Sequence, residues 1–316
     1  MSGSGLLPAA SNKGRAENAE GAAQAGSNDV SFRFEIIAPP AELAGWINTF
    51  YVIETEDARI TEIVPAYSAQ LVVIVRGGLV LDDVDGVPQR AATITINAPQ
   101  LKAAPCVLEG PALVIGASLT PVGWQALANL PADEVHNRLL PPATILSEPE
   151  IAMLEGAAAQ CRAGLITAAE ICPRISDVVA AARFVLRPDH VAVVDAITRW
   201  LGTGFDPPLA ELYDSIDLSQ RQLQRLSRRY FGAPPAQVLK RVRAIRAAML
   251  LANPALPDAL RDDMMTGYFD QAHLIRDMRR YTGRTPTQLR ARTLSSGLLN
   301  PRGHGNTAEI LRAEAG

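Results

Sequence analysis

With 316 residues, of which 48% are hydrophobic and 20% charged, the chain has the length for two domains and the composition of an ordinary globular protein. Its apolar stretches fall short of the ~18 residues that a transmembrane helix needs, so we expect no membrane contact. The cysteines Cys106, Cys161 and Cys172 are far apart and lack a paired metal spacing. A sparse, odd set of this kind favours buried thiols in the reducing cytoplasm over a disulfide framework.

Charge is distributed unevenly along the chain. Residues 189–292 hold 16 Lys and Arg against 11 Asp and Glu, a net charge of +5, whereas the remaining residues have a net charge of −8. A basic segment attached to an acidic remainder indicates a polyanionic partner for that segment alone.

Short β-like runs follow one another between residues 30 and 120. The run 32–36 alternates with period two, and the later runs are rich in β-branched residues: 60–64, 71–75, 92–96 and 113–115. Between the runs lie pairs that we interpret as turns, namely Gly77-Gly78, Asp85-Gly86, Ala98-Pro99 and Gly110-Pro111. Many short strands predict a sandwich or a small barrel, with a short helix over 41–47.

Beyond Pro121 the composition becomes helical, over segments 122–130, 149–162 and 175–186. The pair Arg187-Pro188 marks a boundary, because the residue before a proline is pushed away from helical geometry. Residues 1–28 are rich in Gly, Ala, Ser and Asn, which predicts a disordered tail.

The C-terminal region contains an internal repeat with an offset of 51 residues. Between positions 220–237 and 271–288, nine of the 18 aligned residues are identical, where composition alone would give about one or two. The identical residues include Arg225/Arg276, Tyr230/Tyr281 and Gly232/Gly283. Two copies of one supersecondary unit are the simplest explanation.

Each copy predicts a short helix, a turn and a second helix, over about 209–230 and 258–281. In the first copy the second helix begins after the N-cap Ser219, and its buried face consists of Leu223, Leu226 and Tyr230. In the second copy the cap is Asp270 and the buried face consists of Leu274, Met278 and Tyr281. A longer helix, 235–252, joins the copies.

The outward faces of both second helices are rich in arginine and glutamine. They carry Gln220, Arg221, Gln224, Arg225 and Arg228 in the first copy, and Gln271, His273, Arg276, Arg279 and Arg280 in the second. Arginine can donate two hydrogen bonds to guanine and glutamine can pair with adenine. A solvated basic face would explain one such helix, but two copies with the same layout favour DNA. The expected phosphate contacts are Arg228, Arg279 and Arg280, together with Lys240, Arg241 and Arg243 on the joining helix.

These residues resemble the AraC/XylS family of bacterial transcription regulators. The resemblance rests on the runs LSQRQLQR at 218–225, GAPP at 232–235, GYFDQAHL at 267–274 and GRTP at 283–286. Members of the family carry two helix-turn-helix units joined by a long helix, and residues early in each recognition helix read bases. The resemblance therefore implies a sequence-specific transcription regulator that binds double-stranded DNA.

Carried over to this chain, the base-contact positions are Arg221, Gln224 and Arg225 in the first unit and Ala272, His273 and Arg276 in the second. Gln220 and Gln271 are added as base-contact candidates from the outward faces. The chain departs from the family where the two helices of a unit touch, because Tyr213 and Asp263 replace a small residue. A tyrosine there pushes the helices apart or points outward, and a buried, unpaired aspartate would cost about a few kcal/mol.

The N-terminal region resembles the cupin-like β-barrel that some members carry as a sensor domain, through Phe50-Tyr51-Val52, Val64-Pro65, 71–75 and Leu119-Thr120-Pro121. The implied fold class is a cupin-like barrel or sandwich followed by an all-α domain with two helix-turn-helix units. The implied segments are a disordered tail (1–28), a sensor or dimerisation domain (29–140), a helical linker (141–188), a DNA-binding domain (189–292) and a second disordered tail (293–316). Implied partners besides DNA are a small-molecule effector, a second copy of the chain and RNA polymerase.

The main alternative is a cupin-like enzyme or ligand-binding protein whose C-terminal helices only pack or bind nucleic acid non-specifically. A catalytic metal in such a barrel needs clustered histidines and carboxylates, yet the strand region from 30 to 120 contains no histidine. We therefore expect no enzyme activity, metal or cofactor. The apolar strands suit an effector pocket or a dimer interface, and the sequence does not separate these.

Overall fold

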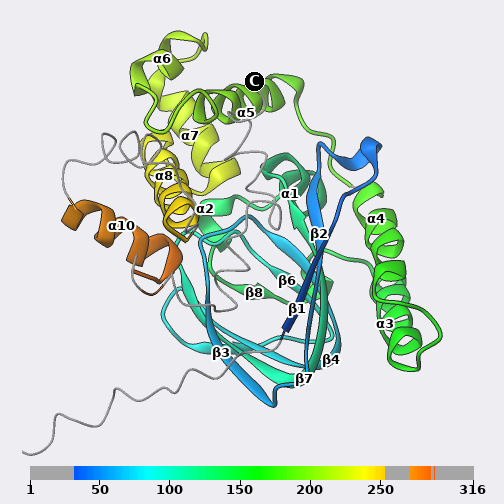
Figure 1. The fold of residues 1–316 in the computed structure, drawn as a ribbon. Coiled ribbons are helices and arrows are strands. Elements are labelled where there is room, and N and C mark those ends of the chain that lie inside the picture. The colour runs from blue at the N-terminus through cyan, green and yellow to red at the C-terminus, as the bar shows by residue number, and fades with distance from the viewer. Residues whose placement is uncertain (1–31, 182, 253–270, 286–287, 289–316) are drawn as a thin grey trace, which may run out of the picture.

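A computed structural model of the chain describes residues 32–181, 183–252, 271–285 and 288. Within these residues, eight antiparallel strands form the N-terminal part, and helices packed beside the sheet form the C-terminal part (Figure 1). The predicted fold class, a β-rich domain followed by an all-α domain, is confirmed. The predicted tails and the first helix of the second unit lie outside the described residues.

Strand β7 (Ala104–Leu119) is the centre of the sheet. One of its edges pairs with β3 (Arg59–Val64) and then β2 (Ile47–Thr55), and the other pairs along β4 (Gln70–Asp82). Strand β1 (Phe32–Ile37) lies outside β2, and β5 (Pro88–Arg90), β6 (Ile94–Asn97) and β8 (Leu139–Leu140) extend the sheet from β4. We refer to this sheet and the helices packed directly on it as the β domain.

Two of the predicted turns lie inside strands, so this part of the strand prediction was wrong. Gly77-Gly78 lies within β4, where the pairing with β7 shifts register. Gly77 has φ +77°, and a Cβ there would lie 2.2 Å from the carbonyl oxygen of Glu109. Gly110-Pro111 lies within β7, where a Cβ on Gly110 would lie 2.0 Å from the carbonyl oxygen of Asp57. Both glycines permit close backbone approach in a bulged ladder.

The expected helix over 41–47 is also shorter than predicted. It is a single 3₁₀ turn, Ala41–Leu43, because β2 begins at Ile47. By contrast, Asp85-Gly86 forms the predicted turn between β4 and β5, and Ala98-Pro99 follows the end of β6.

Four helices cover the sheet before the C-terminal part begins: α1 (Pro121–Ala128), α2 (Ala132–Val135), α3 (Glu148–Arg162) and α4 (Cys172–Ala180). Figure 1 shows α3 and α4 side by side along the sheet, and they pack on β4 and β7 respectively. Trp124, Leu154 and Ile175 are buried in the same cluster as Phe50 and Ile115 of the strands. The segment 148–180 therefore shares one core with the sheet.

The C-terminal part consists of α5 (Pro188–Leu201), α6 (Leu209–Asp214), α7 (Gln220–Phe231), α8 (Pro235–Ala252) and α10 (Gln271–Thr282). The bounds of α6, α7 and α8 agree with the predicted helices, within one residue at the end of α7. The expected inner faces are buried: Leu223, Leu226 and Tyr230 on α7, and Leu274, Met278 and Tyr281 on α10.

One hydrophobic cluster continues from the sheet into these helices. It contains Ile60, Val72 and Leu108 of the strands together with Leu223 and Leu274 of the two repeats. Apolar packing of this kind is the dominant favourable contribution to association. The two parts of the chain are therefore joined by a buried, water-excluding contact.

The three cysteines differ in burial, which leads to a first prediction. Burial raises the pKa of the Cys106 thiol to about 12 and that of Cys172 to about 11, so thiolate is scarce at pH 8. Cys161 is only half-buried, and its pKa is raised less. We predict that iodoacetamide at pH 8 labels Cys161 about tenfold faster than the other two, as measured by peptide mass spectrometry. Labelling in urea is the control, where the three rates should converge; faster native labelling of Cys106 would contradict the structure.

Candidate DNA interface and its attachment to the β domain

Helix α7 begins and ends at local signals in the sequence. The Ser219 hydroxyl accepts a hydrogen bond from the Gln222 amide at 3.3 Å, and the Gln222 side-chain oxygen accepts one from the Ser219 amide at 3.0 Å. This reciprocal pair is a capping box, which satisfies amides left unpaired at the first turn. At the other end Gly232, with φ +80°, closes the helix by donating to the Arg228 carbonyl at 2.8 Å. Local chemistry therefore fixes the length of α7.

The outward face of α7 has the predicted composition. Gln220, Arg221, Arg225 and Arg228 are exposed. Gln224 is half-buried, and its amide lies 3.5 Å from the phenol oxygen of Tyr213, to which it donates. Tyr213 of α6 is itself half-buried against the shared core, so it lies between α6 and α7. The tyrosine that departs from the family pattern thus positions a candidate base-contact side chain.

Helix α10 presents the matching face of the second copy. Ala272, His273, Arg276, Arg279 and Arg280 are exposed. Gln271 is the first residue of the helix, but its side chain, like Asp263 and the expected cap Asp270, lies outside the described residues.

The basic residues of α8 differ in direction. Lys240 is exposed, but Arg243 is only 13% exposed and points at the carboxylates of Asp206, at 2.7 Å, and Asp277, at 4.0 Å. This inward direction disagrees with the phosphate contact that the sequence predicts for Arg243, because the guanidinium is paired with carboxylates of the protein. Arg241 is half-buried and donates to the Phe231 carbonyl at 3.2 Å.

Arg246 has a positioning role that sequence reasoning missed. It is buried and donates to the carbonyls of Leu201 at 2.7 Å and Gly204 at 2.6 Å. Burial lowers the pKa of its guanidinium to about 10. Arg243 and Arg246 lie one helical turn apart and hold the α5–α6 connection against α8. Their spacing on one helix face is the signal that could have identified them as a pair.

The C-terminal end of α7 is attached to the β domain. The side-chain amide of Gln125 donates to the Arg229 carbonyl at 3.1 Å, and Arg229 donates to the side chain of Asn129. A Cβ on Gly232 would lie 2.5 Å from the side chain of Leu101. Glycine at the end of this helix therefore serves both the positive φ and the close approach of the two domains.

The C-terminal end of α10 is attached in the same way. The amide of Ala103 donates to the Arg280 carbonyl at 2.9 Å, and that of Ala66 donates to the Tyr281 carbonyl at 2.7 Å. Gly283, with φ +69°, repeats the position of Gly232, and a Cβ there would lie 2.3 Å from the side chain of Ile63. Backbone amides of the β domain thus satisfy carbonyls that a helix terminus leaves without partners.

The residue after Gly283, Arg284, forms a buried ion pair with the β domain. Arg284 donates to the carboxylate of Glu62, whose side chain is 5% exposed. Glu62 lies on β3, directly opposite Cys106 of β7 in the strand register. Removing one partner of a buried pair is costly, because the other charge remains desolvated. The ion pair therefore fixes the end of the second repeat to β3.

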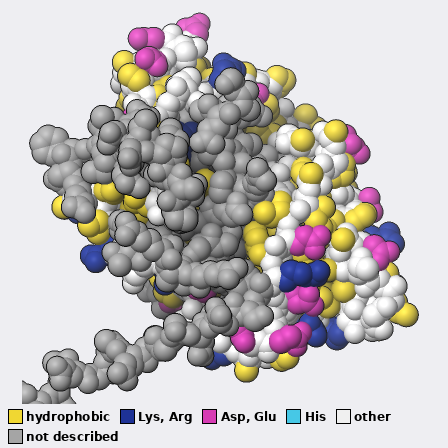
Figure 2. Space-filling view, viewed as in Figure 1, with side chains coloured by type: hydrophobic (Ala, Val, Ile, Leu, Met, Phe, Trp, Pro, Cys, Tyr) yellow, Lys and Arg dark blue, Asp and Glu magenta, His cyan; other side chains and the backbone are white. Residues whose placement is uncertain are grey.

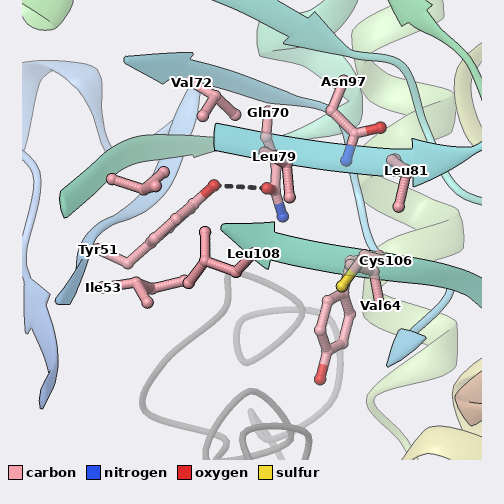
Figure 3. Close-up of a pocket in the computed structure, with 12 residues that line it drawn as sticks. Tyr51, Ile53, Val64, Gln70, Val72, Leu79, Leu81, Asn97, Cys106 and Leu108 are labelled. Carbon is pink, nitrogen blue, oxygen red and sulfur yellow. Dashed lines mark hydrogen bonds between the residues drawn. The ribbon is translucent and has the colours of Figure 1, made fainter. Parts of the chain in front are cut away.

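An apolar cavity of about 70 Å³ lies within the sheet beside this contact (Figure 3). Its walls are mostly aliphatic, with Val72, Leu79 and Leu108 facing the space. Polar atoms come from Tyr51, whose phenol donates to the Gln70 side-chain oxygen at 2.6 Å, and from Asn97. Burial raises the pKa of Tyr51, so its phenol stays protonated at physiological pH. Such a space suits a neutral, mainly apolar molecule with one or two polar groups.

Figure 2 shows how charge is distributed over one face of the molecule. Carboxylates gather at the α6 end, and acidic and basic side chains alternate over the strands. Ion pairs on the strands and the turn after β2 include those of Arg33 with Glu54 and of Arg76 with Glu54 and Glu56. Paired charges of this kind give the β domain little attraction for a polyanion.

No group of three or more His, Cys, Asp or Glu side chains among the described residues is arranged to hold a metal ion. None of the described helices combines the length and apolar character needed to cross a bilayer.

Parts of this chain are similar to known proteins. Residues 212–292 match the family model described as a helix-turn-helix domain, which spans both repeats. A search of curated proteins finds no match. Among solved structures, ToxT from Vibrio cholerae O395 has 11% identity and a TM-score of 0.42, covering 82% of this chain and 96% of ToxT. ToxT of strain SCE256 with bound unsaturated fatty acid has 10% identity and a TM-score of 0.41, covering 85% and 98%. The AraC-like transcriptional activator CuxR has 13% identity and a TM-score of 0.30, covering 75% and 87%.

The attachment of α10 leads to a second prediction. Replacing Arg284 by Gln removes the charged partner of Glu62, so the end of α10 should separate from the β domain more often. We expect about tenfold faster hydrogen exchange at the amides of Ala66 and Ala103, which donate to α10 carbonyls.

The matched control is Arg279→Gln, which removes an exposed arginine from the same helix. Unchanged exchange at both amides in Arg284→Gln, or equal acceleration in the control, would show that the ion pair does not hold the helix.

Proposed function

We propose that this chain, whose C-terminal region is an AraC-type helix-turn-helix domain, regulates transcription by placing the first turns of α7 and α10 in the major groove of specific DNA sites. The observation that carries the proposal is the shared layout of the two helices. In both, the inner face and C-terminal end are buried or attached, whereas the first two turns present exposed polar side chains. Recognition helices contact base edges through these N-terminal residues.

In this proposal the two repeats divide the reading of bases. The first reads through Gln220, Arg221, Gln224 and Arg225, and the second through Gln271, Ala272, His273 and Arg276. Arg225 and Arg276 occupy equivalent positions of the repeat, and both are exposed. A bidentate contact of each with guanine is the chemistry that we assign to them.

Phosphate contacts are assigned to the exposed cations beside these faces, Arg228, Arg279 and Lys240. Arg243 is left out because its guanidinium is paired with Asp206. Arg241 and Arg280 are left out as well, because they line a cleft toward the β domain.

The assignment of base contacts predicts the effect of two substitutions. Arg225→Ala and Arg276→Ala should each weaken binding to the operator by roughly 1–3 kcal/mol and relax specificity at one base position. Fluorescence anisotropy with operator and scrambled duplexes at fixed salt measures both effects.

Lys240→Ala is the contrasting variant, because a phosphate contact carries no sequence information. It should weaken operator and scrambled duplexes alike and reduce the salt slope by about one. If both arginine variants bound the operator as tightly as the unaltered protein, the assignment of these helices as readers would be wrong.

We further propose that the apolar cavity of the β domain binds a small effector. The aliphatic wall and the few polar groups that face the cavity support this proposal. The cavity also lies beside the Glu62–Arg284 ion pair, since Cys106 lines it and is opposite Glu62 in the strand register. Homodimerisation and contact with RNA polymerase are proposed from the family resemblance alone. A regulator that binds chromosomal DNA acts in the bacterial cytoplasm, which is the location we propose.

The effector proposal predicts a site that a single large side chain can fill. Fluorobenzene should broaden in ¹⁹F NMR on binding to the unaltered protein, because dry apolar cavities bind small aromatic molecules. Val114→Phe adds a ring at the cavity wall and should weaken this binding about tenfold.

Val87→Phe is the control, since it makes the same change at a residue that is 56% exposed. Absence of fluorobenzene binding to the unaltered protein, or equal binding by Val114→Phe with an unchanged Tm, would refute the site.

A further inference from the structure

A second cavity, of about 280 Å³, lies between the two domains. The β domain contributes Leu101, Lys102 and His136 to its wall, and the ends of the two repeats contribute Gly232, Arg280 and Tyr281. Arg241 of α8 completes it. The cleft therefore lies where both recognition helices end against the β domain, away from their first turns.

The wall of this cleft is strongly basic. The basic side chains of Lys102, Arg241 and Arg280 line it, together with the imidazole of His136. The described lining residues include no carboxylate, and the nearby Asp277 is within ion-pair distance of Arg243. Like charges that converge on one space repel one another, so an anion placed among them lowers the electrostatic cost.

Some of these cations are held in place by contacts within the protein. The Lys102 ammonium donates to the Val84 carbonyl at 2.7 Å, and Arg241 donates to the Phe231 carbonyl at 3.2 Å. The guanidinium of Arg280 lies 5.5 Å from the ring centre of Tyr281, within the range of a cation–π contact. The cleft is thus built before any ligand enters, which reduces the entropy lost on binding.

The same wall also has an apolar component. The side chain of Leu101, Ala233 and the ring of Tyr281 face the cleft beside the cations. A free inorganic ion would use only the charges, whereas a molecule with a small apolar or aromatic body would use both kinds of surface.

We propose that this cleft binds a small organic anion, a carboxylate or a phosphate monoester, whose charged group is held by Lys102 of the β domain and Arg280 of the second repeat. An anion held from both sides would stabilise the attached arrangement of the domains, because it binds only where the two walls meet. The proposal is independent of the apolar cavity, with which this cleft shares no lining residue.

The test uses the full chain and three ¹⁹F NMR probes: 4-fluorobenzoate, 4-fluorophenyl phosphate and the neutral 4-fluorobenzyl alcohol. We expect at least one anion to bind more tightly than the alcohol at about 0.15 M ionic strength, where distant charges are screened. The comparison between the two anions distinguishes a carboxylate site from a phosphate site.

Arg280→Gln should weaken binding of the preferred anion about tenfold, and Lys102→Gln should have a similar effect. Arg279→Gln is the matched control, since it removes the neighbouring exposed charge, which does not line the cleft. Val114→Phe should leave anion binding unchanged, which separates this cleft from the apolar cavity. Anions that bind no better than the alcohol, or an equal loss in Arg279→Gln and Arg280→Gln, would overturn the proposal.

Discussion

The arrangement of this molecule depends on how the C-terminal ends of α7 and α10 are held by the β domain. In both helices a carbonyl of the last turn accepts a hydrogen bond from the β domain, from Gln125 in one case and from the amide of Ala103 in the other. A glycine then allows close approach, at Gly232 and Gly283. Because the ends are held, the first turns of both helices project away from the contact. The β domain thus acts as a second scaffold for the helix-turn-helix units, in addition to α8.

The contacts that hold α10 lie next to residues that line the apolar cavity of the β domain. Glu62 pairs with Arg284 at one surface of β3, and its register partner Cys106 lines the cavity on β7. Tyr67 also lines the cavity, and it follows Ala66, whose amide donates to the Tyr281 carbonyl. A ligand that moved either strand would therefore act directly on groups that hold α10. Coupling between a ligand in the cavity and the second repeat requires an element that can adopt two arrangements. The contacts identify the C-terminal end of α10 as this element, which is either attached to the β domain or separated from it.

The first helix-turn-helix unit could be predicted nearly to the residue, because its signals are local: Ser219 with Gln222 at one end, Gly232 at the other, and a regular apolar stripe between them. The full length of β4 and β7 could not be predicted. Gly77 and Gly110 look like turn residues in the sequence, and only the backbone of the neighbouring segment shows that each one permits a close contact within a strand. The ion pair of Arg243 could not be predicted for a similar reason, because its partner Asp206 lies in a connection 37 positions earlier in the sequence. The basic cleft was equally out of reach, since Lys102 and Arg280 are 178 positions apart in sequence.

The distribution of identities within the repeat now has a physical explanation. The copies agree at Leu223/Leu274 and Tyr230/Tyr281, which are buried, and at Arg229/Arg280 and Gly232/Gly283, which meet the β domain. They differ at Arg221/Ala272, Gln222/His273 and Gln224/Ile275, in the first turns. Packing and attachment thus require the same residues in both copies. Among the proposed reading positions, Gln220/Gln271 and Arg225/Arg276 are shared, whereas Arg221/Ala272 offers different chemistry. An alanine can make only an apolar contact where arginine can donate two hydrogen bonds to guanine. Two units that read bases through these positions would therefore recognise different sequences, and the site of a single chain would lack two-fold symmetry.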